Sequence, residues 1–197
     1  MIMTDSERVN KSLLEVGIEV DSVYDLVNTS MSYPEAIQPL IEHLKNIQDV
    51  NIKEGIIRAL TVKEAKGIAN NTLFEVYNKI NEIANSGIRW VIGNAFTVII
   101  RAEDVDRILK IVSNKDNGMS RQMFVMALSK IKSRKQDIEN VLIDLLDDDL
   151  VCSHAINTLG KLKSVKAEPL LLTLTEHSRP LVRKEAVKAL KKIEKEA

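Results

Sequence analysis

The sequence has 197 residues, of which 45% are hydrophobic and 28% charged, with a single cysteine, a composition that fits one globular domain and excludes an internal disulfide framework. The formal net charge is zero, but residues 1–50 carry −6 and residues 151–197 carry +5, so we expect an acidic and a basic end. The sequence has neither an apolar run long enough to cross a bilayer nor the pattern of a signal peptide, and we expect a cytoplasmic protein.

The first thirty residues predict a helical cap at the N-terminus. Thr4-Asp5-Ser6-Glu7 has the pattern of a capping box, and the helix that it opens is expected to end at Gly17. Asp21 is expected to cap a second helix that reaches Val27. Ser32-Tyr33-Pro34-Glu35 then opens a different pattern, so we interpret residues 1–30 as an atypical terminal unit.

From residue 33 onward the chain repeats one helical motif. The motif is clearest in the last helix, where apolar residues spaced i, i+4, i+7 and i+8 form a single stripe: Val182, Ala186, Ala189 and Leu190. Its last position recurs with periods of 36, 32, 31 and 31, at Leu60, Phe96, Leu128, Leu159 and Leu190. A second apolar helix precedes each copy, at 35–45, 73–83, 105–112, 138–146 and 170–174. Such periods predict stacked helix–turn–helix units.

The motif Val182–Leu190 (VRKEAVKAL), with its weaker copies upstream, resembles the HEAT-like repeats of bacterial scaffolds and of phycobilin-lyase-type proteins. The resemblance implies a right-handed α-solenoid whose second helices line a concave surface. We therefore expect one all-α domain over residues 1–197, with about five HEAT-like hairpins at 33–196 behind the cap. Because such repeats serve many functions, the fold alone does not assign one.

If the motif positions form the core, the residues equivalent to Lys184, Lys188 and Lys191 face the groove. The three middle repeats place uncharged side chains there, including the only tryptophan, with Gly160 at the third position of its repeat. Tryptophan and methionine are enriched in protein-binding surfaces, although Trp90 packing between helices is an alternative. The predicted partner-binding residues are Trp90, Asn94, Gln122, Met126, Ser153 and Asn157.

The position after the first core residue is basic in four of five repeats: Lys53, Arg89, Arg121, Cys152 and Arg183. A basic row can bind phosphates. Alternatively, it can link the repeats through carboxylates in the turns between helices. We favour structural links, with Asp49, Asp116 and Asp148 as the partners.

The sequence shows no catalytic motif, metal site or cofactor site. Cys152 and His154 are two residues apart and point to different sides of a helix, so we interpret Cys152 as a space-filling residue. Asp147-Asp148-Asp149 lacks the alternating ligands of a calcium loop, and its last residue is expected to cap the following helix.

These observations favour a non-catalytic protein-binding module, namely a scaffold, adaptor or inhibitor. The first alternative is a nucleic-acid binder or a DNA glycosylase of the HEAT-like alkylpurine type, which needs a basic groove with a central carboxylate. The second alternative is a lyase or chaperone acting on a cofactor-bearing protein, which rests on the resemblance alone. We expect a protein partner in the concave groove, and no nucleic acid, cofactor or membrane.

Overall fold

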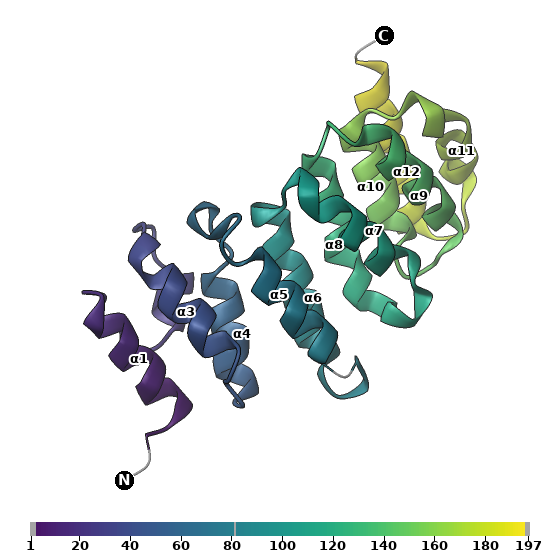
Figure 1. The fold of residues 1–197 in the computed structure, drawn as a ribbon. Coiled ribbons are helices and arrows are strands. Elements are labelled where there is room, and N and C mark those ends of the chain that lie inside the picture. Colours follow the sequence, from purple (N-terminus) through teal and green to yellow (C-terminus); the bar gives the residue numbers. More distant parts are fainter. Residues whose placement is uncertain (1–2, 81, 196–197) are drawn as a thin grey trace. The chain divides into compact units, whose positions relative to one another are not determined.

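The computed structural model describes residues 3–80 and 82–195, with the backbone alone for 82–86. In these residues the chain is all-α, and its helices divide into two compact units, Met1–Ile99 and Ile100–Ala197 (Figure 1). None of the described helices is long and apolar enough to cross a bilayer. One continuous repeat array over residues 1–197 remains a prediction.

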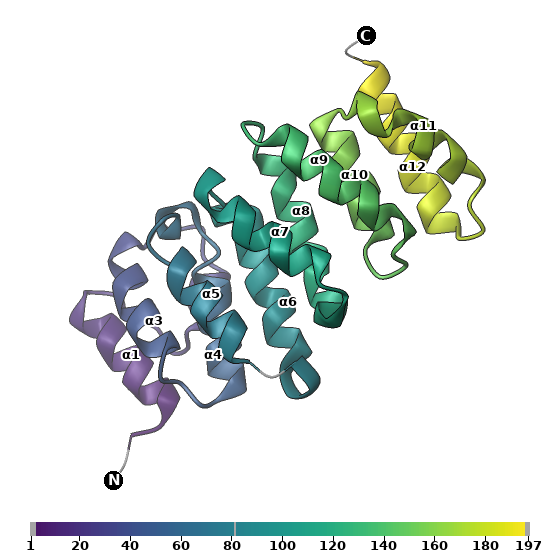
Figure 2. The same cartoon turned by 45° about the vertical axis from the view of Figure 1, so that its right-hand side comes forward.

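The first unit consists of paired helices in two rows. Its pairs are α1 (Asp5–Glu15) with α2 (Tyr24–Val27), α3 (Ile37–Leu44) with α4 (Val50–Ala59), and α5 (Asn70–Lys79) with α6 (Glu82–Ile99). The 3-10 helices η1 (Pro34–Ala36) and η2 (Lys63–Ala65) precede α3 and α5. First helices pack on first helices and second on second, because α1 contacts α3, α2 contacts α4 and α4 contacts α6 (Figure 2).

Local sequence signals fix the ends of α1, as predicted. The Thr4 hydroxyl accepts a hydrogen bond from the Glu7 amide at 3.2 Å, and the Glu7 carboxylate accepts one from the Thr4 amide at 2.7 Å. This reciprocal pair is a capping box. Gly17 has a φ of 82°, a conformation that suits glycine, and the helix ends just before it.

Two other boundaries in the first unit differ from the prediction. Asp21 does not cap α2, which begins at Tyr24 without a side-chain cap; instead the Asp25 carboxylate accepts the amide N–H groups of Asp21 and Ser22. The helix expected at 73–83 ends earlier than predicted, because α5 ends at Lys79 and α6, which contains Gly87, begins at Glu82. A glycine inside a helical pattern, here at position 87, is a weak signal of a helix end.

The second unit also consists of paired helices. Its pairs are α7 (Val105–Ser113) with α8 (Arg121–Ala127), α9 (Lys135–Asp144) with α10 (Cys152–Leu162), and α11 (Glu168–Thr173) with α12 (Pro180–Glu194). Short 3-10 helices lead into or finish these elements, at η3 (Ala102–Asp104), η4 (Lys115–Ser120), η5 (Leu128–Lys130), η6 (Leu145–Asp147), η7 (Val165–Ala167) and η8 (Leu174–Glu176). The second helices α8, α10 and α12 pack in succession.

The repeated motif forms the core of both units. The last motif position is at most 7% exposed in every copy, at Leu60, Phe96, Leu128, Leu159 and Leu190. The small residues allow close helix packing, since a Cβ added to Gly160 would lie 2.7 Å from the Cα and Cβ atoms of Ala189. Gly160 is therefore buried between α10 and α12, and the expectation that it faces the groove is wrong.

Candidate functional site

The six predicted partner-binding residues all lie half-buried on second helices. Trp90 and Asn94 are on α6, in the first unit, whereas the other four belong to α8 and α10 in the second unit. Each helix contributes two of them, four residues apart, so the two share a helix face. We call this side of the second helices the second-helix face.

In the second unit this face contains an open depression of about 260 Å³. It is lined by Met126 of α8, by Ser153, His154 and Asn157 of α10, and by Leu181 and Glu185 of α12. The fold thus brings together three of the predicted residues, from two helices. Gln122 lies on the same face of α8, one turn before Met126, outside the lining.

Sequence reasoning missed His154, Leu181 and Glu185. His154 and Glu185 are 31 residues apart, so they occupy the same position in successive repeats, directly after the predicted groove residues Ser153 and Lys184. A prediction that included the residues next to each groove position would have found His154 and Glu185, because a helix presents more than one line of side chains to a groove.

The polar groups of the depression are partly used inside the protein. The Asn157 amide donates to the Glu185 carboxylate at 3.0 Å, and Lys188 donates to the same carboxylate at 2.7 Å. Burial alone would raise the pKa of Glu185, but the hydrogen bonds from Lys188 and Asn157 lower it below its usual value. Glu185 is therefore ionised at neutral pH, and one N–H of the Asn157 amide links α10 to α12.

Two further side chains of this face have internal contacts. The Gln122 amide donates to the Leu150 carbonyl at 2.9 Å and so links α8 to the turn before α10. Burial lowers the pKa of His154, whose Nδ1 lies 3.5 Å from the Ser153 hydroxyl. His154 is therefore uncharged at neutral pH, and the depression combines an exposed leucine and a methionine with neutral polar groups and one carboxylate.

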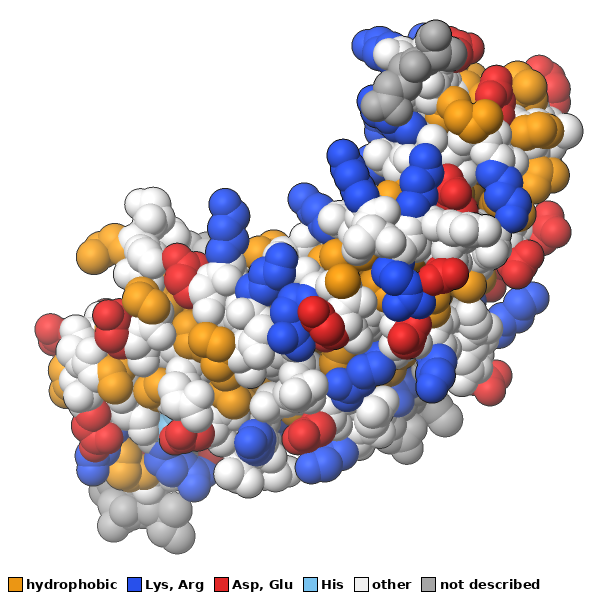
Figure 3. All heavy atoms as spheres, turned by 45° about the horizontal axis from the view of Figure 1, so that its top comes forward, with side chains coloured by type: hydrophobic (Ala, Val, Ile, Leu, Met, Phe, Trp, Pro, Cys, Tyr) orange, Lys and Arg blue, Asp and Glu red, His pale blue; other side chains and the backbone are white. Residues whose placement is uncertain are grey.

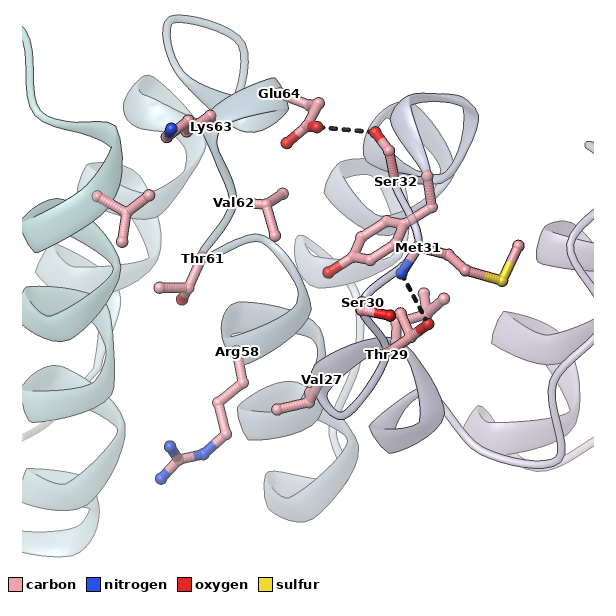
Figure 4. A pocket seen from close by; sticks show the side chains of 13 residues that line it. Val27, Thr29, Ser30, Met31, Ser32, Arg58, Thr61, Val62, Lys63 and Glu64 are labelled. Atoms are coloured by element: carbon pink, nitrogen blue, oxygen red, sulfur yellow. Dashed lines mark hydrogen bonds between the residues drawn. The ribbon is translucent and has the colours of Figure 1, made fainter.

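The first unit has a larger pocket, of about 370 Å³, lined mainly by the segments that follow α2 and α4 (Figure 4). Arg58 of α4 and Thr61, two residues after that helix, occupy groove positions of the first repeat and line the pocket together with Val98 of α6 and the segment 29–33. Arg58 donates to Glu54 at 2.8 Å. Trp90 and Asn94 lie earlier on α6, outside the lining of this pocket.

Arg121 makes the expected bond to a turn carboxylate, whereas Arg89 and Arg183 of the same row bond to backbone carbonyls. Arg121 is fully buried, and its guanidinium donates to the Asp148 carboxylate at 2.8 Å, which confirms Asp148 as one of the predicted partners. Arg89 donates to the carbonyl of Tyr77 and lies over its ring, 4.6 Å from the centroid. Arg183 donates to two carbonyls of the turn before α12. These guanidinium groups are occupied by internal acceptors, which does not favour a phosphate-binding row.

Cys152 and the aspartate cluster have structural roles in this unit. Cys152 is buried, and burial raises the pKa of its thiol, so its place at a helix N-terminus does not produce a thiolate. Asp149 does not cap α10, whose N-cap is Val151 without a side-chain bond. Asp149 instead accepts a hydrogen bond from Arg179 at 2.8 Å, because its side chain lies beside the turn before α12.

Comparisons with known proteins agree with this geometry. The family described as HEAT repeats matches residues 139–197, which include α10 and α12. A designed armadillo repeat protein matches with a TM-score of 0.54 at 14% identity, over 94% of this chain and 99% of its own. The chain is a HEAT-like repeat protein. An engineered protein of known structure matches with a TM-score of 0.55 at 18% identity, over 98% of both chains.

Among curated proteins, none matches this repeat protein. The two structural matches are below 25% identity, so they show the fold alone, an all-α solenoid of stacked hairpins. Repeat solenoids are typical of protein-interaction scaffolds, because stacked helices present a continuous row of side chains to a partner.

Proposed function

We propose that this repeat protein is a non-catalytic scaffold, adaptor or inhibitor that binds another protein on its second-helix face. The observation that carries the proposal is the depression at which α8, α10 and α12 meet, lined by Met126, Ser153, His154, Asn157, Leu181 and Glu185. Three successive repeats contribute to it, so its shape depends on the repeat packing and not on one loop.

The chemistry of the depression suits an apolar side chain of a protein partner. Leu181 is 52% exposed, and Met126, opposite it across α10, is a flexible side chain that adapts to irregular surfaces. Ser153 and His154 supply neutral hydrogen-bonding groups beside this apolar pair. Buried apolar anchors surrounded by polar groups are the usual organisation of a protein interface.

The same lining gives little support to nucleic-acid binding. The lining contains no lysine or arginine and has one carboxylate, whereas nucleic-acid affinity comes largely from basic contacts with phosphates. In the first unit, Trp90 and Asn94 of α6 are proposed separately as partner-binding residues, with Trp90 as the aromatic anchor.

The test is capture of partners by the tagged chain from its native cells, with and without nuclease. We expect a stoichiometric protein that survives nuclease and is lost with Ser153→Arg, because the long charged side chain fills the depression. Trp90→Ala combined with Met126→Ala should also weaken capture, by about tenfold or more. Circular dichroism checks that each variant keeps its helices.

Gln136→Arg is the matched control, since Gln136 is exposed on the first helix α9. It introduces the same charge and should leave capture unchanged. Recovery of nucleic acid alone, with nothing left after nuclease, would replace the proposal with the nucleic-acid alternative. Unchanged capture by folded Ser153→Arg would contradict the use of this face.

A further inference from the structure

Three lysines occupy the same position in the three repeats of the second unit. They are Lys130 in η5, Lys161 in α10 and Lys192 in α12, each 31 residues from the next. The equivalent positions of the two preceding repeats hold Val62 and Val98, so this row of cations begins in the second unit. We call the three side chains the lysine column.

The packing of the second helices brings these lysines together. The helix α10 contacts both η5 and α12, so the middle lysine lies between the other two. Partial burial of the Lys161 amine lowers its pKa, and repulsion from Lys192 and Lys130 lowers it further. Lys161 is thus close enough to both neighbours for their charges to act on it. Figure 3 shows lysine and arginine side chains beside uncharged ones near the C-terminal end of the chain.

The repulsion within the column is compensated only in part inside the protein. The carboxylate that acts on Lys161 is Glu185, which already accepts a hydrogen bond from Lys188 at 2.7 Å. Glu194 is exposed two residues after Lys192, and it therefore points to a different side of α12. No hydrogen bond or ion pair joins the column to another residue in the described part of the chain. The column therefore keeps a positive charge that a partner can neutralise.

The helix dipole accounts for part of this arrangement. Lys161 and Lys192 lie in the last turns of α10 and α12, where a cation is favoured on any side of the helix. Lysines on different sides of their helices would have the same benefit without the repulsion between neighbouring repeats. The alignment of the three on one side therefore favours a role in binding.

The column borders the depression on the second-helix face. In α10, Lys161 follows Asn157 of the lining by four residues, which is about one helical turn on the same side. Lys130 follows Met126 by the same interval, and the third lysine lies two turns beyond the lining carboxylate of α12. A partner that fills the depression therefore reaches the column with its neighbouring residues.

We propose that the partner contributes an extended segment in which an apolar residue is followed by acidic residues. This proposal rests on the proposed function, because the apolar residue occupies the depression and the carboxylates pair with the lysine column. Packed helix axes are about 8–10 Å apart, and an extended chain advances about 3.3 Å per residue. Carboxylates about three residues apart therefore meet successive lysines. A nucleic acid suits the surface less well, because its phosphates would approach Glu185 and it offers no apolar side chain to the depression.

Binding of fluorescein-labelled poly-L-glutamate to the full chain, followed by fluorescence anisotropy, tests the column directly. We expect binding that weakens with added salt, which screens the charges. Lys130→Gln, Lys161→Gln and Lys192→Gln together form the column variant. It should bind about tenfold or more weakly than the wild type, because three cations are lost from one surface.

The matched control combines Lys110→Gln, Lys115→Gln and Lys166→Gln, which remove the same charge from exposed positions in α7, η4 and η7. It should bind poly-L-glutamate like the wild type. A wild type that does not bind this probe, or an equal loss in the control, would overturn the proposal. A thymidine oligonucleotide that binds through the column more tightly than poly-L-glutamate of equal length would replace the acidic protein with a nucleic acid.

Capture from native cells separates this proposal from the proposed function. The protein that the wild type captures should dissociate as salt is raised, and the column variant should retain about tenfold less of it. Unchanged capture by the column variant would overturn the acidic segment and leave the proposed function standing. A wild type that captures no protein would instead contradict the proposed function itself.

Discussion

The Arg121 guanidinium joins two repeats of the second unit. Its Nε donates to the Gly118 carbonyl at 2.9 Å, and its terminal nitrogen donates to Asp148 at 2.8 Å. Arg121→Met would leave the buried Asp148 carboxylate without its cation. Removal of one partner of a buried ion pair costs about 3–5 kcal/mol. We expect a loss of that size in the free energy of unfolding, measured by urea denaturation.

Arg183→Met is the matched control at the same repeat position. Arg183 donates to two carbonyls, one part-buried and one exposed, and these are neutral acceptors, so its loss should cost about 1 kcal/mol or less. Equal losses for the two variants would contradict the role of the buried pair.

The pair also predicts a pH dependence. Burial alone would raise the pKa of Asp148, but the hydrogen bonds from Arg121 and from the Leu150 amide lower it below its usual value. A lowered folded-state pKa gives stability that is present above about pH 4 and is lost as the pH falls through the folded-state pKa. The gap in unfolding free energy between wild type and Arg121→Met should therefore shrink in acid.

Residue patterns predicted the local contacts better than the long-range ones. The Thr4–Glu7 capping box lies within four residues, and the sequence specifies it completely. The repeat spacing predicted Asp148 as one of three turn carboxylates that bond to the basic row, but it did not assign Asp148 to Arg121. The hydrogen bonds of Asn157 to Glu185 and of Gln122 to Leu150 were missed, because they depend on the rotation of one helix against the next. The same rotations determine which side-chain amides already form hydrogen bonds inside the protein.

At the scale of helices, α10 and α12 approach closely at Gly160 and Ala189. A Cβ on Gly160 would lie 2.7 Å from the Ala189 backbone, which cannot move aside as a long side chain can. Gly160→Ala should therefore push the helices apart. Overpacking of this kind costs about 1–3 kcal/mol, and we expect that loss as a lower thermal midpoint.

Gly87→Ala separates this effect from helix propensity. A Cβ on Gly87 of α6 meets nothing within 4 Å, so alanine there should be neutral or stabilise by up to about 1 kcal/mol. If Gly160→Ala melted like the wild type, the packing of the two helices would be looser than the structure indicates.

The order of the helices was predictable because the apolar period persists through all five copies. The motif positions are buried as expected, since any helix with that stripe must pack it against a neighbour. The α5–α6 break and the Gly160 contact were not predictable, because glycine suits turns, helix interiors and close contacts alike. The candidate site was predicted in part, because the helical stripe identifies only one line of side chains on each helix. The stripe gave Met126, Ser153 and Asn157, whereas Leu181 entered through the packing of α12 on α10.

At the scale of the whole molecule, the first and second helices of the second unit are expected to differ in partner binding. The proposed partner site lies on the second helices α8, α10 and α12, and its lining contains no residue of the first helices α7, α9 and α11 of the same unit. Exposed variants on the first helices should therefore leave partner capture intact. Ser153 lies on α10, within the lining, whereas the control residue Gln136 lies on α9, outside it.

The measurement that tests the central claim most directly is hydrogen exchange of the chain with and without its captured partner. Binding slows exchange where a partner covers or stabilises the backbone. We expect added protection in α8, α10 and α12, with little change in α7, α9 and α11 of the same unit. Protection confined to the first helices would contradict the account, because the partner would then bind the side opposite the second-helix face.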